Sequence, residues 1–400
     1  MPRPKTLSAK VVRGIAPGIK DDALVGAVRF HDAQIDDARH TVAVARTAAA
    51  HGAAIATRTA VVSLIREDGR VVGAVIRDEL TGREFETRAR VVLGAAGAWS
   101  DDLLEMSGSS SQHAVRQSKG IHLVVPREAF PSTSALIART PTSVLFLLPW
   151  GRHWLIGTTD TDYTGSRSEP QVDEADVDYL LAEANKWLAR PLTRDDVVGI
   201  YSGLRPLLSA GTGEDGTATL SREHAVLRPA PGLVLIAGGK YTTYRVMASD
   251  AVDAAVASRA EVITDNVPGC ETDELPLVGA AGYSAAWAAR ERTAREAGLT
   301  LAQVEHLLRR HGDRTRTVLD LIAVDPKLAE PMHPEAPYLL AEAVIAITRE
   351  GAVGLDDVLV RRTRLALETR GGGVDVAQSI AEVLAPYANW TEADIAAQVA

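Results

Sequence analysis

The sequence predicts a mixed α+β and α/β core over residues 1–262 and a separate all-helical domain over residues 270–400. Short apolar runs bounded by turn residues, which are typical of buried strands, recur throughout the first region. Glycine-rich turns there join strands to helices. Beyond Val262 the chain becomes rich in Ala, Leu, Arg and Glu at helical spacing, and no alternating run appears.

The composition limits the classes of function. A chain of 400 residues is too long for one small core, and 46% hydrophobic residues support a folded protein. The net charge of -9, from 43 basic and 52 acidic side chains, argues against general affinity for nucleic acid. The single cysteine, Cys270, excludes an intrachain disulfide and fits a reducing cytosol. No set of Cys and His stands at metal-ligand spacing.

The N-terminal segment MPRPKTLSAK is basic but lacks the apolar stretch of a signal peptide. No apolar run in the chain is long enough to span a bilayer. We therefore expect a cytoplasmic protein. Peripheral attachment to the cytoplasmic face of a membrane stays open, because an amphipathic patch built from separate elements leaves no clear mark on a sequence.

Residues 36–99 are expected to form a helix, an antiparallel meander and a buried strand. Asp36 and Asp37 begin the helix and Gly52 ends it. Turn sequences such as Glu-Asp-Gly-Arg separate the strand-like runs that follow. These runs are 54–58, 61–66, 71–77, 84–88 and, as the buried strand, 90–93. After them, Ala96 and Gly97 lie among small residues that allow the backbone to approach either a ligand or a packed helix.

A sheet-rich lobe is expected over residues 119–208. Strands are predicted at 121–125, 144–148 and 154–157, and a helix at 173–189. Mixed elements of this kind indicate an α+β lobe packed on the first sheet.

The stretch VLIAGGKYTT predicts a buried strand that enters a helix through a sharp turn. Gly238 and Gly239 allow the backbone to turn and to approach a ligand closely, while Thr242 and Thr243 are expected to cap the helix. Free N–H groups and the positive end of a helix dipole favour an anion or an electron-rich ring edge at such a place.

An ordered set of motifs resembles that of one enzyme family. The motifs are VRFHDAQIDDARH, VVLGAAGAW, KGIHLVV, LLPWGRHWLIGTTDTDY, IYSGLRPLL, SREHAVL, GGKYTTYR and DDVLVRRTRLAL. Their order and spacing, from about Val28 to the last helices, are similar to those of the FAD-dependent glycerol-3-phosphate dehydrogenases. The resemblance implies a glutathione-reductase-like FAD-binding core, a substrate lobe and a closing helical domain. It also implies oxidation of sn-glycerol 3-phosphate to dihydroxyacetone phosphate, with electrons passed to a membrane quinone, and leaves homodimer formation open.

Two departures from the family pattern stand out. The usual Asn-Ala-Thr-Gly is here Gly94-Ala95-Ala96-Gly97, which removes two side chains able to hydrogen-bond near the cofactor. No G-x-G-x-x-G, the turn that seats the FAD pyrophosphate, occurs in the sequence. We therefore expect an N-terminally incomplete FAD-binding core, and we favour a fragment over a chain completed by another polypeptide.

Three basic residues are candidates for an anion site. Arg205 lies in an apolar strand, where its guanidinium would grip a phosphate with two hydrogen bonds or form an internal ion pair. Arg222, in SREHAVL, is either a second phosphate ligand or a solvated turn residue. Lys240 begins a helix, where positive charge is unfavourable unless a reduced flavin or a phosphate faces it.

Oxidation of an alcohol requires a base to take the hydroxyl proton, and a pKa near neutrality suits that role. His122, in KGIHLVV, is the residue that the family resemblance favours, with a satisfied core histidine as the alternative. His224 and His153 are weaker candidates. Asp160 and Asp162 are expected to organise a turn or to orient other groups rather than to act as the base.

Two other functions compete with this interpretation. An amine or amino-acid oxidase on a similar fold would need a site for a carboxylate in place of a phosphate. A non-catalytic fragment or partner subunit would bind neither flavin nor substrate. A substrate panel and the colour of the purified protein separate these alternatives.

Overall fold

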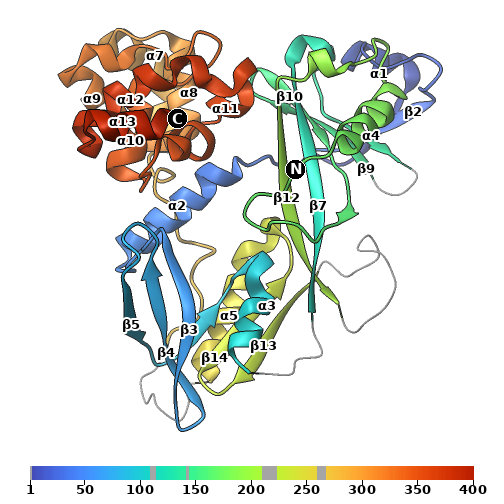
Figure 1. Ribbon diagram of the computed structural model, residues 1–400. Helices are drawn as coiled ribbons and strands as arrows, with labels where there is room; N and C mark the ends of the chain where they lie inside the picture. Colours follow the sequence, from blue (N-terminus) through green and yellow to red (C-terminus); the bar gives the residue numbers. More distant parts are fainter. Residues whose placement is uncertain (1, 109–113, 141–143, 210–222, 259–266) are drawn as a thin grey trace.

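The structure, a computed structural model, describes residues 2–108, 114–140, 144–209, 223–258 and 267–400. Figure 1 shows the C-terminal helices gathered above α2 (Asp37–Ala50), with two long strands, β7 (Ala114–Pro126) and β12 (Gly199–Ser209), extending down to a second sheet. Helix α2 lies between the helical domain and a three-stranded meander. These parts make up the predicted mixed core and helical domain.

The N-terminal segment forms elements that the sequence did not indicate. Strands β1 (Lys5–Ser8) and β2 (Gly26–Arg29) pair antiparallel and flank α1 (Ala9–Ile15). These strands are mostly exposed, so they carry no apolar alternation that would predict them. Helix α2 begins as predicted, because the Asp36 carboxylate accepts a hydrogen bond of 3.1 Å from the backbone N–H of Arg39.

The predicted meander is confirmed as β3 (Thr59–Glu67), β4 (Arg70–Asp78) and β5 (Glu84–Arg88), all antiparallel. The strand expected at 54–58 is wrong. That segment pairs with no described strand, and Arg58 turns the chain with a φ of 52°. A strand requires a neighbour for its backbone groups, and the apolar run alone does not supply one.

A small mixed sheet lies at the bottom of Figure 1. Strand β14 (Leu233–Gly238) pairs in parallel with β6 (Val92–Gly94) and antiparallel with β13 (His224–Ala230). Helices α3 (Ser100–Met106) and α5 (Tyr244–Ala257) follow the two parallel strands. Because parallel strands run in one direction, β6 and β14 end at the same edge of the sheet.

The predicted sheet-rich lobe contains a six-stranded sheet. Its order is β11-β7-β10-β9-β8, with β12 paired to β7, and its pairings are antiparallel. The remaining strands are β8 (Leu136–Arg139), β9 (Val144–Trp150), β10 (His153–Gly157) and β11 (Thr161–Asp162). Buried residues of β7 and β10, such as Leu123 and Trp154, pack in one core with Leu180 of α4 (Glu174–Asn185).

The C-terminal domain is helical, as predicted. Its helices are α6 (Tyr283–Ala288), α7 (Arg290–Ala297), α8 (Leu301–His311), α9 (Thr315–Val324), α10 (Leu340–Arg349), α11 (Leu365–Glu368), α12 (Val374–Ala388) and α13 (Glu392–Val399). Helix α10 is buried from Leu340 to Ala346 and forms the centre of the domain core. Within the described ranges, no helix is long and apolar enough to cross a membrane.

The helical domain contacts the six-stranded sheet through α11. At Gly199, the first residue of β12, an added Cβ would lie 2.2 Å from the carbonyl oxygen of Leu367. Backbone therefore meets backbone at this point, and glycine allows the approach. Gly203, on the same strand, has no atom within 4 Å of an added Cβ.

We expect Gly199→Ala to lower the free energy of unfolding by about 1–3 kcal/mol, because the methyl group would push α11 away from β12. Guanidinium unfolding followed by circular dichroism measures the change. Gly203→Ala is the matched control and should stay within about 0.5 kcal/mol of the parent. Equal effects of the two variants would contradict the close contact at Gly199.

Candidate functional site

Two glycine-containing turns lie at the shared end of β6 and β14. Gly97 follows β6 with a φ of 54°, while Gly238 and Gly239 end β14 with φ values of 73° and 81°. These left-handed conformations favour glycine, which agrees with the predicted sharp turns. The parallel pairing of Leu235 with Gly94 brings the two turns to one edge of the sheet.

Packing explains some of the small residues after β6 and leaves others unexplained. An added Cβ at Gly94 would lie 2.4 Å from Leu235 and 2.7 Å from Leu103, so this glycine is needed for packing. An added Cβ at Gly97 would meet no atom of the described residues within 4 Å. Ala96 immediately precedes the 3₁₀ turn of Gly97–Trp99. Packing therefore does not explain why residue 97 is glycine, and contact of Ala96 and Gly97 with a ligand stays a prediction.

The turn after β14 packs against its own surroundings as well. Added Cβ atoms would lie 2.7 Å from the Glu223 carbonyl oxygen at Gly238 and 2.5 Å from the Met247 sulfur at Gly239. Lys240 is exposed, and its ammonium group has no hydrogen-bond or ion-pair partner among the described residues. Close approach of the Gly239 backbone to a cofactor stays a prediction.

The predicted threonine cap is wrong in its geometry. Residues Tyr241–Thr243 form a 3₁₀ turn, and α5 begins only at Tyr244. Thr243 stands at the N-cap position, but its hydroxyl donates to the Lys240 carbonyl at 3.0 Å and makes no cap bond to α5. The first N–H groups of α5 are therefore not capped by this side chain.

Tyr241 ties this turn to the start of α2. Its hydroxyl lies 2.7 Å from Nδ1 of His40 and donates to the Asp37 carbonyl oxygen at 3.1 Å. Tyr241 stands inside the GGKYTTYR motif, but nothing in that motif alone indicates its contacts with α2.

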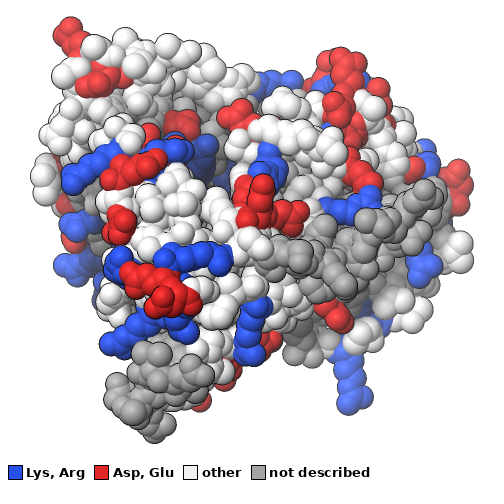
Figure 2. All heavy atoms as spheres, turned by 60° about the horizontal axis from the view of Figure 1, so that its bottom comes forward, with Lys and Arg blue, Asp and Glu red and all other residues white. Residues whose placement is uncertain are grey.

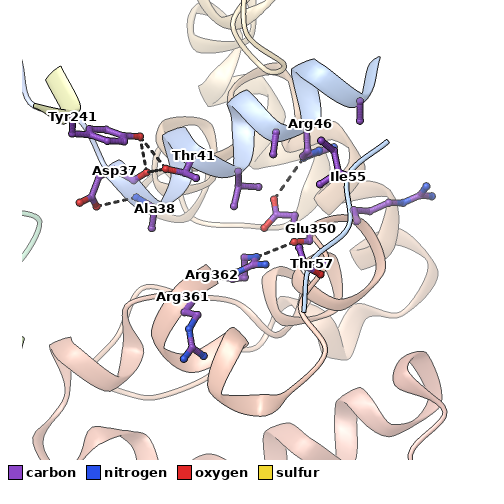
Figure 3. A pocket seen from close by; sticks show the side chains of 15 residues that line it. Asp37, Ala38, Thr41, Arg46, Ile55, Thr57, Tyr241, Glu350, Arg361 and Arg362 are labelled. Atoms are coloured by element: carbon purple, nitrogen blue, oxygen red, sulfur yellow. Dashed lines mark hydrogen bonds and ion pairs between the residues drawn. The ribbon is translucent and has the colours of Figure 1, made fainter. Parts of the chain in front are cut away.

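A cavity of about 740 Å³ adjoins the same region. Helix α2 and the helical domain form most of its wall, and Tyr241 stands at one end (Figure 3). Figure 3 shows Arg46 and Arg362 pointing toward Glu350. The cavity thus neighbours the glycine turn, and none of the residues predicted for the site lines it directly.

His122 and Arg205 come together on the six-stranded sheet. The pairing of β7 with β12 sets His122 opposite Tyr201, and the two rings stack with centroids 5.0 Å apart and planes 9° apart. The Arg205 guanidinium donates to the Thr159 carbonyl at 3.1 Å and to the Thr158 hydroxyl at 3.0 Å. Glycines make the room: Gly157 lies against the imidazole and Gly120 against the guanidinium.

Burial lowers the pKa of His122 to about 4, and the nearby Arg205 contributes to the lowering while Asp37 opposes it. This pKa lies below the near-neutral value expected of the residue. Neutral imidazole is the form present at pH 7.

Of the remaining candidates, only Asp160 reaches this pair among the described residues. His224 lies 2.8 Å from a carboxylate oxygen of Asp250, and His153 is buried on β10. Asp162 pairs with Arg116 at 2.6 Å. Asp160 contacts Ser118 and lies 4.0 Å from Arg205, in agreement with an orienting role.

Arg222 lies outside the described residues. No described contact joins Lys240 to either His122 or Arg205, so convergence of the three basic residues stays a prediction. Figure 2 shows basic and acidic side chains intermixed on the face drawn there. In the part of the chain that the structure describes, no group of three His, Cys, Asp or Glu residues is arranged to hold a metal ion.

Sequence reasoning missed the residues that connect these places. Arg364, just before α11, donates to Asp36 at 2.9 Å and to Asp37 at 2.7 Å. Its guanidinium also lies 4.6 Å from the ring centroid of Trp150. Asp36 and Asp37 lie in the motif VRFHDAQIDDARH, and Arg364 lies in DDVLVRRTRLAL. An ion pair between residues so far apart cannot be predicted from either motif alone.

Comparisons with known proteins agree with the motif resemblance. Residues 1–248 match the family described as FAD dependent oxidoreductase, and residues 270–395 match the C-terminal domain of alpha-glycerophosphate oxidase. The chain is 48% identical over 386 residues to glycerol-3-phosphate dehydrogenase 2 of Mycobacterium tuberculosis, which covers 96% of this chain and 65% of that protein. It is 46% identical over 400 residues to the glycerol-3-phosphate dehydrogenase of Mycobacterium leprae, covering 100% of this chain and 67% of that protein.

A solved structure is similar over nearly the whole chain. It is the X-ray structure of the glycerol-3-phosphate dehydrogenase from Bacillus halodurans complexed with FAD, with a TM-score of 0.84 and 29% identity. The match covers 99% of this chain and 80% of that one. The chain spans 65–67% of the length of the two mycobacterial relatives.

The pKa of His122 predicts a pH dependence of stability. Between pH about 6.5 and 4, the unfolded chain binds a proton that folded His122 does not, so the free energy of unfolding falls as the pH is lowered. We expect His122→Gln to reduce the loss of stability between pH 7 and pH 5. Urea unfolding at the two pH values measures it, with the exposed His31→Gln as control. The same loss in His122→Gln and in the parent would contradict the burial of a neutral imidazole.

Proposed function

The chain belongs to the FAD-dependent glycerol-3-phosphate dehydrogenase family, and from this premise we propose that it acts in the oxidation of sn-glycerol 3-phosphate to dihydroxyacetone phosphate. The observation that supports the assignment most is the pair of His122 and Arg205 on adjoining strands. An imidazole able to accept a proton stands beside a guanidinium able to bind a phosphate. The substrate sn-glycerol 3-phosphate carries a hydroxyl proton for the first and a phosphate for the second.

We propose FAD as the cofactor, which supplies a two-electron acceptor when bound. Ala96, Gly97, Gly238 and Gly239 would contact it along the shared edge of β6 and β14. Thr242 and Thr243 would lie next to it at the start of α5, and the exposed Lys240 would face the negative charge of the reduced ring. Support comes from the positive φ values at this edge and the open space beside Gly97.

In this proposal His122 takes the proton of the C2 hydroxyl. A histidine with a pKa of about 4 is a weak base, so the substrate itself must raise that pKa. A phosphate dianion bound to Arg205 offsets the positive charge that contributes to the low value. Binding of the correct anion would therefore prepare the base for proton transfer.

We also propose Arg205 and Arg222 as phosphate ligands, a quinone as the electron acceptor, and peripheral contact with the cytoplasmic face of a membrane. Family membership is the support for the acceptor and for the location. Activity assays with a water-soluble quinone analogue test the electron acceptor. Co-sedimentation of the protein with liposomes tests the membrane contact. Analytical ultracentrifugation tests for a homodimer.

A single preparation tests the main proposal against its alternatives. Purified protein should release FAD on denaturation, and it should reduce a redox dye with sn-glycerol 3-phosphate. Reduction with amino acids in place of the phosphate ester would favour an amine or amino-acid oxidase. Colourless protein that binds neither FAD nor substrate would indicate a non-catalytic chain.

We expect Arg205→Ala to lower kcat/KM for sn-glycerol 3-phosphate about 30-fold or more, because losing a charge-assisted pair to a buried phosphate costs about 2–5 kcal/mol. Arg205→Lys should recover only part of the loss, since an ammonium group cannot make the two-pronged grip.

Arg194→Ala provides the control, because Arg194 pairs with Asp178 on the surface at 2.7 Å, with both side chains about half exposed or more. Its kcat/KM should match that of the parent. Unchanged efficiency in Arg205→Ala would remove Arg205 from the phosphate site.

A further inference from the structure

We propose that Arg364, which the helical domain contributes, is a positioning residue for His122: with Asp37 it fixes the Tyr201 ring on which the imidazole is stacked. The inference rests on the proposed role of His122 as the base. It goes further by assigning a part in the chemistry to the C-terminal domain, which supplies no group to the proposed site.

The Arg364 side chain is held on several sides. It is 14% exposed and donates to the carboxylates of Asp36 and Asp37 at the start of α2. The same guanidinium lies over the ring of Trp150, at the end of β9. A charge-assisted pair and a cation–π contact together leave such a side chain little freedom.

Tyr201 is part of the same packing. Tyr201, Arg364 and Glu368 line one void of about 10 Å³, which has room for about one water molecule. Trp150 lines the void as well, and its indole N–H donates to Glu368 at 3.2 Å. Tyr201 therefore borders the segment 364–368 across this void, and the His122 ring is stacked on the Tyr201 ring in turn.

Charged groups from three elements surround this ring pair. Strand β12 contributes Arg205, α2 contributes Asp37, and the helical domain contributes Arg364, with Glu368 lining the void beside Tyr201. The residues of β10 next to this pair, Leu155 and Gly157, carry no charge. Burial raises the pKa of Tyr201 to about 12, with Arg364 and Asp37 acting on it in opposite directions. Arg364 therefore does two things: it neutralises Asp37, and it lines the void beside the partly buried Tyr201.

This arrangement couples the docking of the helical domain to the state of the base. Helix α11 reaches β12 at Gly199, two residues before Tyr201. When the domain is docked, Arg364 keeps Asp37 paired and His122 neutral. Without the arginine, an unpaired carboxylate and entering water would both favour the protonated imidazole.

The test measures the pKa of His122 directly, in protein labelled with ¹³C at histidine Cε1, with the signal assigned from His122→Gln. The pKa is expected near 4 in the parent. Arg364→Ala should raise it by about one unit, and Asp37→Asn should lower it. Arg364→Lys should fall between Arg364→Ala and the parent. Opposite signs for the two removals would show that the Arg364–Asp37 pair acts on His122, whereas a general loosening would raise the pKa in both variants.

Arg370→Ala is the matched control. Arg370 also joins the helical domain to the sheet-rich lobe, through a hydrogen bond of 2.6 Å to the Asp195 carbonyl oxygen. Among the described residues, no contact joins it to Tyr201 or Asp37. The pKa of His122 should not change in this variant. Equal increases in Arg364→Ala and Arg370→Ala would overturn the proposal, and so would an unchanged pKa in Arg364→Ala.

A second measurement needs no acid titration. At pH 7 the His122 ring protons should be shifted upfield by the stacked Tyr201 ring. Arg364→Ala should lose part of that shift if the variant is folded by circular dichroism, and an undiminished shift would contradict the proposal. Neither measurement needs FAD or turnover. If the chain fails to oxidise glycerol 3-phosphate while the His122 pKa responds as expected, the proposed function is wrong and the positioning role of Arg364 still holds.

Discussion

The structure depends on the burial of charged side chains as pairs between α2 and the helical domain. Glu342 and Glu350 are each 1% exposed, and an unpaired carboxylate at either place would cost several kcal/mol. Arg39 of α2 donates to Glu350 with both terminal nitrogens, at 2.5 and 2.7 Å. Arg310 donates to Glu342 at 2.9 Å within the helical domain and also pairs with Asp36, at the start of α2, at 3.7 Å. Burial alone would raise the pKa of both glutamates. His306, His311 and Arg310 around Glu342, and Arg39 beside Glu350, outweigh it and hold both pKa values low.

A guanidinium fork satisfies a carboxylate in a narrow range of geometries, so these pairs fix where α2 lies. Its first turn then carries the consequences to two places. The Asp37 carbonyl holds Tyr241 beside the glycine turn, and the Asp37 carboxylate holds Arg364 beside Tyr201. The start of α2 therefore contacts residues beside both the proposed cofactor edge and the proposed base, although these two places lie on different sheets.

Local features of the fold could be predicted from the sequence because their causes are local. The aspartates before α2, the tight turns of the meander and the continuous apolar run of β14 each act within a few residues. The strand expected at 54–58 is absent because pairing depends on a neighbour that no window contains. The start of α5 was misplaced because a 3₁₀ turn precedes it.

The site shows the same division. Arg205 could be placed in an apolar strand, and the match of motifs suggested His122. The stacking on Tyr201 and the low pKa depend on the register of β7 with β12, which the sequence does not specify. The role of Arg364 depends on contact between segments more than 300 residues apart.

The partition of the Arg39–Glu350 pair between two domains limits how this chain can be divided. The core carries Arg39 and the helical domain carries Glu350. Either part alone would therefore have a charged side chain without the ion-pair partner that allows its burial. The two domains are in this sense not interchangeable modules. Recombination between relatives would preserve folding only where both sides of the ion pair are inherited together, and expression of the helical domain by itself would leave Glu350 without Arg39.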